Sequence, residues 1–251
     1  MNIRQLLNLL TVLLTIGVNG LANALPINNQ TTGEISDRFP VLFTPAGYVF
    51  SIWGLIYLAL LAFAIYQALP AQRKNPRLER VGYWFVAANL FNGAWIFFWH
   101  YNLFALTLLV MVGLLVSLIM VYRRLEIGIS KAPAIEKWVV DFPFSLYLGW
   151  ISVATIANGS VFLYDLGWNG EPLGPVFWTV LVLVVGAILG GLMILRRNDW
   201  VYPLVLAWAF AGIVVKQADT FAVALTAGLA ALAVVVVLVL SQIPGSRLAR
   251  A

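Results

Sequence analysis

The sequence predicts an all-α membrane protein that crosses the bilayer about eight times. Of its 251 residues, 62% are hydrophobic and only 10% are charged, and the mean hydropathy is +0.93. A soluble domain has about 45–50% apolar and about 25% charged residues, so this chain lacks the polar surface that water requires. Its apolar residues also form unbroken runs of about 20, whereas a membrane β-barrel needs segments of about ten residues with alternating polarity. These patterns exclude a water-soluble fold and an outer-membrane barrel.

Eight apolar segments, each bounded by charges, proline or turn residues, supply the predicted crossings. In chain order they cover residues 6–24, 48–69, 81–99, 104–122, 138–161, 176–195, 201–215 and 221–243. The fifth segment is long and carries Asp141 and Pro143 near its start. The seventh is short and has Pro203 in its first turn, which makes it the least regular of the set.

The basic residues predict the orientation of these segments. With eight crossings, both termini and the second, fourth and sixth loops lie on one side of the membrane. Of the 15 lysines and arginines, only Arg38 and Lys216 then fall on the other side, which leaves 13 on the first. Cytoplasmic loops are rich in Lys and Arg. We therefore expect both termini in the cytoplasm and the chain in a prokaryotic inner or thylakoid-type membrane.

The N-terminal segment has a second interpretation. Arg4, the apolar run 6–18 and the small-residue sequence Ala22-Asn23-Ala24 are also typical of a cleavable signal peptide. Cleavage would leave seven helices, with the other loops on the same sides. The run is long enough to cross the bilayer once residues 21–25 are included, which favours a spanning helix.

The composition narrows the partners and cofactors. Without cysteine, the chain has no disulfide, iron–sulfur cluster or thiolate metal site, and its one histidine, His100, is expected to be exposed at the membrane interface. We expect no metal ion and no required cofactor. The net charge of +5 is explained by the loops described above, so the expected partner is the lipid bilayer and not a nucleic acid.

Aromatic and amide side chains share one face on each of three segments. The faces, recurring every three or four residues, comprise Phe50, Trp53 and Tyr57; Asn89, Asn92, Trp95 and Trp99; and Tyr147, Trp150, Ala154 and Asn158. A buried amide needs a hydrogen-bond partner, so these faces should point inward and enclose a pocket for a planar hydrophobic ligand. Two alternatives remain: asparagines often join helices to each other, and tryptophans near segment ends form interfacial belts. The belt is expected to comprise Trp84, Trp99, Trp138, Trp168, Trp178 and Trp200.

Three motifs on the same segments resemble the TspO/MBR family of translocator proteins, also called tryptophan-rich sensory proteins. Residues 43–57 (FTPAGYVFSIWGLIY) resemble the proline-rich entry and W–xxx–Y core of its second helix. Residues 92–95 (NGAW) resemble its third-helix NxxW, and residues 147–158 (YLGWISVATIAN) its fifth-helix YLxWxxxATxxN. The motifs occur in family order and at family spacing, although the stretch from Tyr48 to Trp53 is one residue shorter than usual.

The resemblance implies a five-helix bundle, residues 1–165, with a ligand cavity closed by the loop 27–46. Residues 166–251 form a three-helix C-terminal extension outside it, which we expect to buttress the bundle. The family binds porphyrins and other flat hydrophobic molecules, so a tetrapyrrole such as protoporphyrin or haem is the expected ligand. The positions that carry over by motif, or share the fifth-segment face, are Trp53, Tyr57, Asn92, Trp95, Tyr147, Trp150, Ala154 and Asn158. The sterol-binding pattern of animal members is absent from the fifth segment.

Three functions are weighed. The leading one is a ligand-binding or sensory membrane protein; the others are a secondary transporter of a small hydrophobic or amphipathic solute, and a porphyrin-modifying enzyme. The deep segments contain no nucleophile–base pair, which makes an enzyme the weakest of the three. Asp141 is expected to be a charge-paired interfacial residue beside Lys137, one turn earlier; proton or cation coupling and helix capping linked to Pro143 are the alternatives. The small-residue pair Gly186/Gly190 predicts close helix contact, either within one chain or between the subunits of a homodimer.

Overall fold

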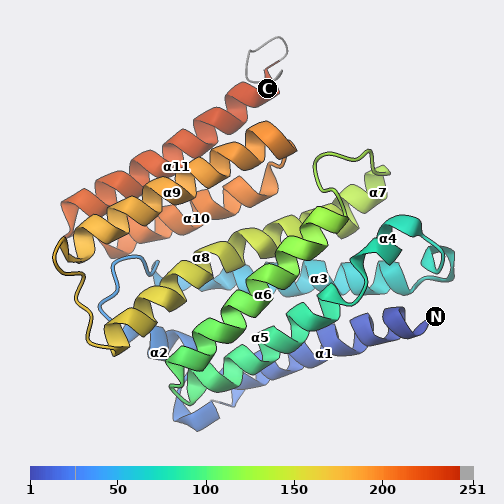
Figure 1. Ribbon diagram of the computed structural model, residues 1–251, viewed down its shortest axis with the longest axis horizontal. Coiled ribbons are helices and arrows are strands. Elements are labelled where there is room, and N and C mark those ends of the chain that lie inside the picture. Colours follow the sequence, from blue (N-terminus) through green and yellow to red (C-terminus); the bar gives the residue numbers. More distant parts are fainter. Residues whose placement is uncertain (26, 244–251) are drawn as a thin grey trace.

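The computed structural model describes residues 1–25 and 27–243, which form helices and turns without a β-strand. Eight long helices run side by side in alternating directions (Figure 1). They are α1 Ile3–Ala24, α3 Ile52–Ala68, α5 Trp84–His100, α6 Phe104–Arg124, α8 Phe142–Asp165, α9 Gly174–Arg197, α10 Val201–Lys216 and α11 Phe221–Gln242. The short elements are η1 Ile27–Asn29, α2 Thr32–Asp37, η2 Gly47–Ser51, η3 Pro70–Gln72, α4 Pro76–Val81, α7 Ala134–Glu136 and η4 Lys137–Asp141.

Each apolar segment predicted from the sequence falls on one of the long helices, so the all-helical membrane fold is confirmed. Six helical stretches of the described chain are long and apolar enough to cross a bilayer: 3–22, 47–68, 104–124, 134–165, 174–197 and 221–242. Helices α5 and α10 have only 17 and 16 residues, or about 25 Å, which is less than the roughly 30 Å of a hydrocarbon core. The number of eight crossings therefore stays a prediction.

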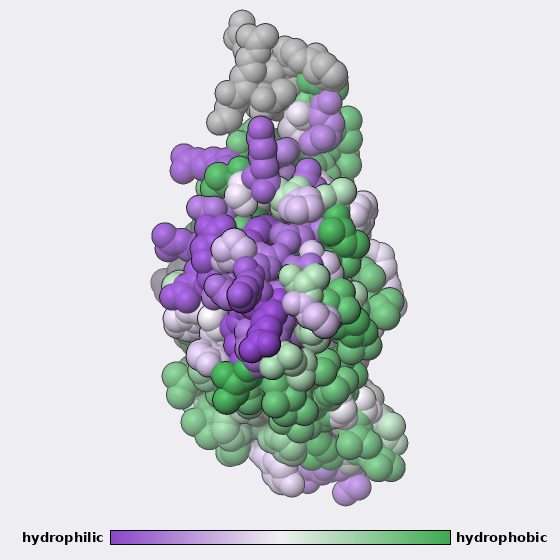
Figure 2. Space-filling model, turned by 90° about the vertical axis from the view of Figure 1, so that its right-hand side faces the viewer, coloured by the Kyte–Doolittle hydropathy of each residue, from purple (hydrophilic) through white to green (hydrophobic). Residues whose placement is uncertain are grey.

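The loops gather at two opposite ends of the molecule. The N-terminus, α4, α7 and the α9–α10 turn lie at one end, which we call the basic end (Figure 1). Hydrophilic side chains cluster there, above a largely hydrophobic flank (Figure 2). Helix α2, the α8–α9 loop and the α10–α11 turn lie at the other end, which we call the lid end. This is the two-sided arrangement that the charge pattern requires; which end faces the cytoplasm stays a prediction.

Helix α8 joins the bundle to the C-terminal extension. It packs against α3 and α6 of the bundle and against α10 of the extension, whereas α9 and α11 pack mainly on each other and on α10. Gly149 makes the close approach between α8 and α10 feasible, because a Cβ at this position would lie 3.0 Å from Val205 and 3.2 Å from the Tyr202 carbonyl oxygen. The extension therefore contacts the bundle chiefly through one helix.

Helix α1 packs with a polar face against α3 and α5. Six polar side chains on this face are buried: Arg4, Gln5, Asn8, Thr11, Thr15 and Asn19. The Gln5 amide donates to the Gln67 carbonyl oxygen at 2.5 Å, and the Thr15 hydroxyl donates to the Asn89 carbonyl oxygen at 3.0 Å. Because buried polar groups need such partners, this pattern favours a permanent bundle helix over a cleaved signal peptide.

The glycine pair of α9 is used within the chain. A Cβ on Gly186 would lie 2.9 Å from the Phe210 ring, and one on Gly190 would lie 3.2 Å from Leu206 and from Val234. These neighbours belong to α10 and α11. Close contact within one chain, the first of the two interpretations of this motif, is thus confirmed.

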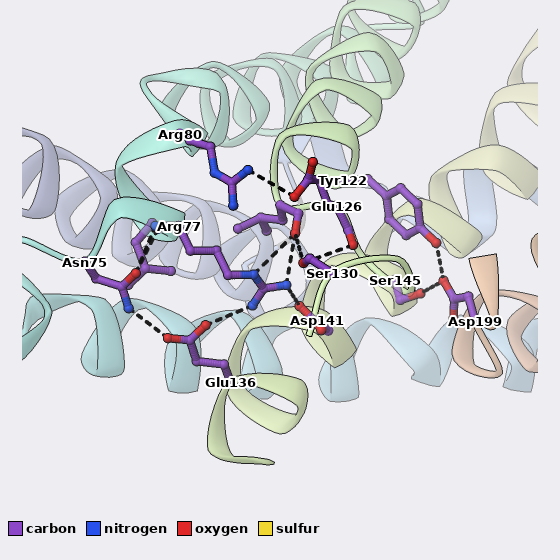
Figure 3. A network of polar contacts seen from close by, with 12 residues as sticks. Asn75, Arg77, Arg80, Tyr122, Glu126, Ser130, Glu136, Asp141, Ser145 and Asp199 are labelled. Carbon is purple, nitrogen blue, oxygen red and sulfur yellow. Dashed lines mark hydrogen bonds and ion pairs between the residues drawn. The ribbon is translucent and has the colours of Figure 1, made fainter. Parts of the chain in front are cut away.

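Buried ion pairs hold the basic end together (Figure 3). The Arg77 guanidinium on α4 pairs with Glu136 at 3.0 Å and with Asp141, and it donates to the Leu125 carbonyl oxygen at 3.1 Å. Asp141 is charge-paired as expected, but its partner is Arg77 of α4 and not the neighbouring Lys137. Residues Lys137–Asp141, between α7 and α8, form a π-helical turn. Pro143 follows it in the first turn of α8; because proline has no N–H, it cannot donate the backbone hydrogen bond of a regular α-helix at this position.

Candidate ligand-binding site

Two adjoining cavities lie beneath α2 at the lid end. The inner cavity, of about 50 Å³, lies among α2, α3, α5, α6 and α8. The lid cavity, of about 320 Å³, lies among α1, α2, α3 and α5. Both are lined by Thr32, Phe50, Trp53 and Trp95, so these four residues form the boundary between them.

Aromatic rings from three helices form the walls. Trp53 stacks on Tyr57, with ring centroids 5.3 Å apart and planes inclined by 21°, and it meets Trp150 edge-to-face at 6.2 Å. Trp95 stacks on Trp99 at 5.4 Å. Such rings offer flat apolar surfaces to a ligand and already hold one another in place by stacking and edge contacts.

Six of the eight residues selected from the sequence line these cavities. Trp53, Trp95, Trp150, Ala154 and Asn158 line the inner cavity, and Trp53, Tyr57 and Trp95 line the lid cavity. The three aromatic-plus-amide faces are thus brought together as expected. Whether these residues contact a ligand stays a prediction.

The other two selected residues fasten helices behind the wall. The Asn92 amide donates to the Tyr147 hydroxyl at 2.7 Å, and the Asn92 carbonyl oxygen accepts from Asn19 at 2.8 Å. These bonds link α1, α5 and α8. Neither Asn92 nor Tyr147 lines either cavity, and this arrangement matches the alternative that an asparagine joins helices.

Polar atoms without partners surround the cavities. In the described part of the chain, five cavity-lining side chains carry a buried polar atom that makes no hydrogen bond: Thr32 Oγ1, Thr44 Oγ1, Tyr57 Oη, Trp95 Nε1 and Trp150 Nε1. A buried donor left unpaired costs about 1–3 kcal/mol, so such groups are rare in folded proteins. These five atoms line the two cavities, so each of them is available to a hydrogen-bonding group placed there.

The segment between α1 and α3 covers the cavities with a short helix. Helix α2 begins with a capping box in which Glu34 accepts from the Thr31 backbone N–H at 2.7 Å and from its hydroxyl at 2.9 Å, and these bonds lower the pKa of Glu34. The Trp99 indole donates to the Thr32 carbonyl oxygen at 3.2 Å, and Lys216 of α10 pairs with Asp37 at 2.8 Å. Further contacts hold this cover: Ile35 is fully buried, and the Arg38 guanidinium donates to the Asn102 side chain, whereas the Lys216–Asp37 pair is partly exposed.

Two residues expected at the membrane interface are buried under this cover. Trp99 is 4% exposed and lines the inner cavity, which corrects its assignment to the aromatic belt. His100 is fully buried, with Nδ1 2.7 Å from the Ile96 carbonyl oxygen, which corrects the expectation of an exposed histidine. The covering segment contacts both residues: the Asn28 side chain donates to the His100 carbonyl oxygen, and the Trp99 indole donates to the Thr32 carbonyl oxygen.

Helix α1 and the covering segment also contribute to the cavities, which was not predicted from the sequence. Asn19 lines the lid cavity, and its helical spacing with Thr11 and Thr15 was the available signal. Thr32 and Thr44 line the inner cavity from irregular or very short elements, in which no periodicity exists to reveal an inward face.

Comparison with known families decides the relationship that these motifs suggest. The sequence model of the TSPO-like protein family matches residues 5–240. The chain belongs to this family. The match confirms the resemblance to the TspO/MBR proteins, and it also takes in the helices of the C-terminal extension, so these helices are part of the matched family sequence. A search of curated proteins and a search of solved structures returned no match.

Proposed function

We propose that this TSPO-like protein is a membrane ligand-binding or sensory protein that holds a planar hydrophobic molecule in the two adjoining cavities. The observation that carries the proposal is the set of unpaired buried donors on aromatic walls, above all Tyr57, Trp95 and Trp150. A flat apolar molecule would stack on the indole rings, and its peripheral oxygens would accept hydrogen bonds from these donors. A tetrapyrrole with carboxylate side chains, such as protoporphyrin or haem, has both properties.

The size of the site makes the covering helix part of the proposal. The lid cavity of about 320 Å³ is at the lower limit of ligand pockets, which span about 300–1,000 Å³. The inner cavity adds little space, so a macrocycle requires that α2 move outward. The partly exposed Lys216–Asp37 pair and the single indole bond to Thr32 are contacts that such a movement can break.

The test is a titration of the purified protein with protoporphyrin and with haem, followed by Soret absorbance. Trp150→Phe keeps an aromatic ring but removes the unpaired indole N–H, so it should weaken binding. Trp84→Phe makes the same change at the start of α5, outside both cavities, and as the control it should leave binding unchanged. Saturable binding with this difference supports the proposal. Equal affinity in all three proteins would place the site elsewhere, and ligand loss with new absorbance bands would indicate an enzyme.

One observation favours the second candidate, a transporter of a small amphipathic solute. The polar face of α1 runs from Arg4 at the basic end to Asn19 in the lid cavity, so polar groups connect the site with the opposite end. Buried polar side chains inside a membrane helix bundle often mark a path for solute or ions. Movement of a porphyrin across proteoliposome membranes that is abolished by Asn19→Leu would support a transporter. Porphyrin binding without such movement would support the ligand-binding or sensory protein instead.

A further inference from the structure

A third cavity, larger than either of the two above, lies at the basic end. It measures about 590 Å³ and is bounded by the α6–α7 loop, the π turn, the start of α8 and the α9–α10 turn. The lining residues that matter here are Lys131, Lys137, Trp138, Phe142, Asp199 and Trp200. None of the proposed ligand contacts lies near it, so it is a separate site.

The floor of this cavity is a fixed polar network (Figure 3). Asp199 is 5% exposed and accepts hydrogen bonds from the Tyr122 hydroxyl at 2.8 Å, from Ser145, and from the Val201 backbone N–H at 2.9 Å. Gly128 lets the α6–α7 loop pack against the end of α9: its φ is +77°, and a Cβ there would lie 1.5 Å from the Arg197 carbonyl oxygen. Asp141 shares the Arg77 guanidinium with Glu136, and the hydrogen-bond donors to Asp199 are neutral, so the floor keeps negative charge and the cationic groups of this cavity are those of its rim.

The rim of the cavity is basic and aromatic. Lys131 and Lys137 line the cavity, are exposed, and make no ion pair within the described ranges 1–25 and 27–243. Trp138, Phe142 and Trp200 form a cluster with ring centroids 5.9–6.2 Å apart. Trp138 and Trp200 are 61% and 43% exposed, which suits side chains at the boundary between lipid tails and headgroups.

An apolar groove leads away from this rim along the membrane-facing side. It measures about 340 Å³, lies between α3 and α10 over α8, and shares Phe142, Trp200 and Val201 with the polar cavity. Leu55 and Leu204 line it farther along. A continuous surface thus changes from cationic to aromatic to aliphatic, starting at the end of the bundle and continuing into its apolar flank.

We propose that this surface is a binding site for one anionic phospholipid of the adjoining leaflet. The phosphate pairs with Lys131 and Lys137, the aromatic cluster contacts the glycerol backbone region, and one acyl chain lies in the groove. Charge complementarity selects this occupant, because two unpaired lysines beside an apolar groove match a lipid that carries a negative headgroup and a long chain. Hydroxyls of a phosphatidylglycerol headgroup can also donate to carboxylate oxygens of the cavity floor.

The experiment is native mass spectrometry of the full-length protein in detergent, titrated with phosphatidylglycerol or phosphatidylcholine of the same chain length. We expect the anionic lipid to bind more tightly than the zwitterionic one. Lys131→Gln/Lys137→Gln should weaken phosphatidylglycerol binding roughly 30-fold, from about 1 kcal/mol per basic residue and 1.4 kcal/mol per tenfold, and erase the preference. Arg73→Gln/Lys74→Gln removes the same charge at the same end, outside the cavity, and should retain the preference for phosphatidylglycerol.

A second pair of variants tests the groove without touching charge. Leu204→Trp fills the groove and should lower affinity for phosphatidylglycerol, whereas Leu189→Trp on the exposed face of α9 should not. Equal binding of the two lipids, or equal losses in the two charge variants, would overturn the proposal in favour of diffuse attraction. Displacement of the bound lipid by glycerol phosphate at similar concentration would also overturn it, since the acyl chain would then contribute nothing.

Discussion

Tyr57 and Tyr147, both selected from the sequence, differ in whether the hydroxyl group makes a hydrogen bond, so they can be compared as a matched pair. The Tyr57 hydroxyl is buried and has no hydrogen-bond partner, although its ring stacks on Trp53. The Tyr147 hydroxyl accepts from the Asn92 amide at 2.7 Å, and Tyr147 lies outside both cavity linings. Replacement of each by phenylalanine removes one oxygen atom and preserves the ring. The two variants should therefore have opposite effects.

The magnitudes follow from what each oxygen does. In Tyr57→Phe the protein loses a buried polar group that nothing satisfies, so the free energy of unfolding without ligand should stay the same or rise, by at most about 1–3 kcal/mol. If a ligand carboxylate accepts a hydrogen bond from this hydroxyl, its loss should cost about 1.5–3 kcal/mol of binding, or roughly 10- to 150-fold in affinity. In Tyr147→Phe the Asn92 donor is left unpaired, so stability should fall by about 1–3 kcal/mol and affinity should change little.

The assay combines thermal unfolding of the ligand-free protein in detergent with protoporphyrin titrations at a temperature where both variants are folded. Tyr57→Phe should keep its thermal midpoint and lose affinity, and Tyr147→Phe should lose thermal midpoint and keep affinity. The reasoning is refuted if Tyr57→Phe destabilises the ligand-free protein and binds protoporphyrin as tightly as the wild type.

Three further outcomes are expected. Arg77→Met should lower the free energy of unfolding by about 3–5 kcal/mol, because it leaves two buried carboxylates without their ion-pair partner. Arg80→Met removes a half-exposed ion pair and should lower it by at most about 1 kcal/mol. Chemical denaturation of the two variants measures the difference. Gly212→Ala should destabilise by about 1–3 kcal/mol, since its Cβ would lie 2.2 Å from Val49, and thermal unfolding measures this. Asn158→Leu should weaken protoporphyrin by roughly 1.5–3 kcal/mol in titrations; a loss confined to stability, about 0.6 kcal/mol, would assign it to helix contact.

The positions of the long helices could be predicted because lipid imposes a strong constraint on sequence. A helix in hydrocarbon must be apolar along about 20 residues, so its ends are marked by charges and prolines. Segment 104–122, for example, corresponds to a helix that ends two residues later, at Arg124. The inward faces of α3, α5 and α8 were also predictable, since aromatic and amide residues recur at helical spacing. These faces supplied Trp53, Trp95 and Trp150 of the cavity wall.

Contacts between distant segments could not be predicted from spacing along the chain. Lys137 lies one turn from Asp141 in sequence, yet Arg77 reaches it from α4, 64 residues earlier. Trp99 and His100 lie at the end of an apolar run, which is the position of an interfacial residue, but a loop that precedes α3 covers them. Local periodicity describes which residues share a face, whereas the identity of the covering element depends on the tertiary fold.

Helix α10 shows why the C-terminal extension is part of the site's support. Its N-terminus is capped by Asp199 in the cavity of the basic end, and Lys216 in its last turn holds Asp37 of the cover. Between these ends, the Ala46 backbone N–H donates to the Gly212 carbonyl oxygen at 3.1 Å, and this bond positions the residues that lead into α3. A lipid bound beside the first turn of α10 and a ligand bound beneath α2 would therefore act on opposite ends of one helix. A helix couples two sites only if each ligand binds one of its positions more tightly than another, and the coupling is positive when both ligands favour the same position. Affinity for protoporphyrin should then depend on the anionic lipid present, and the lysine variants should remove that dependence.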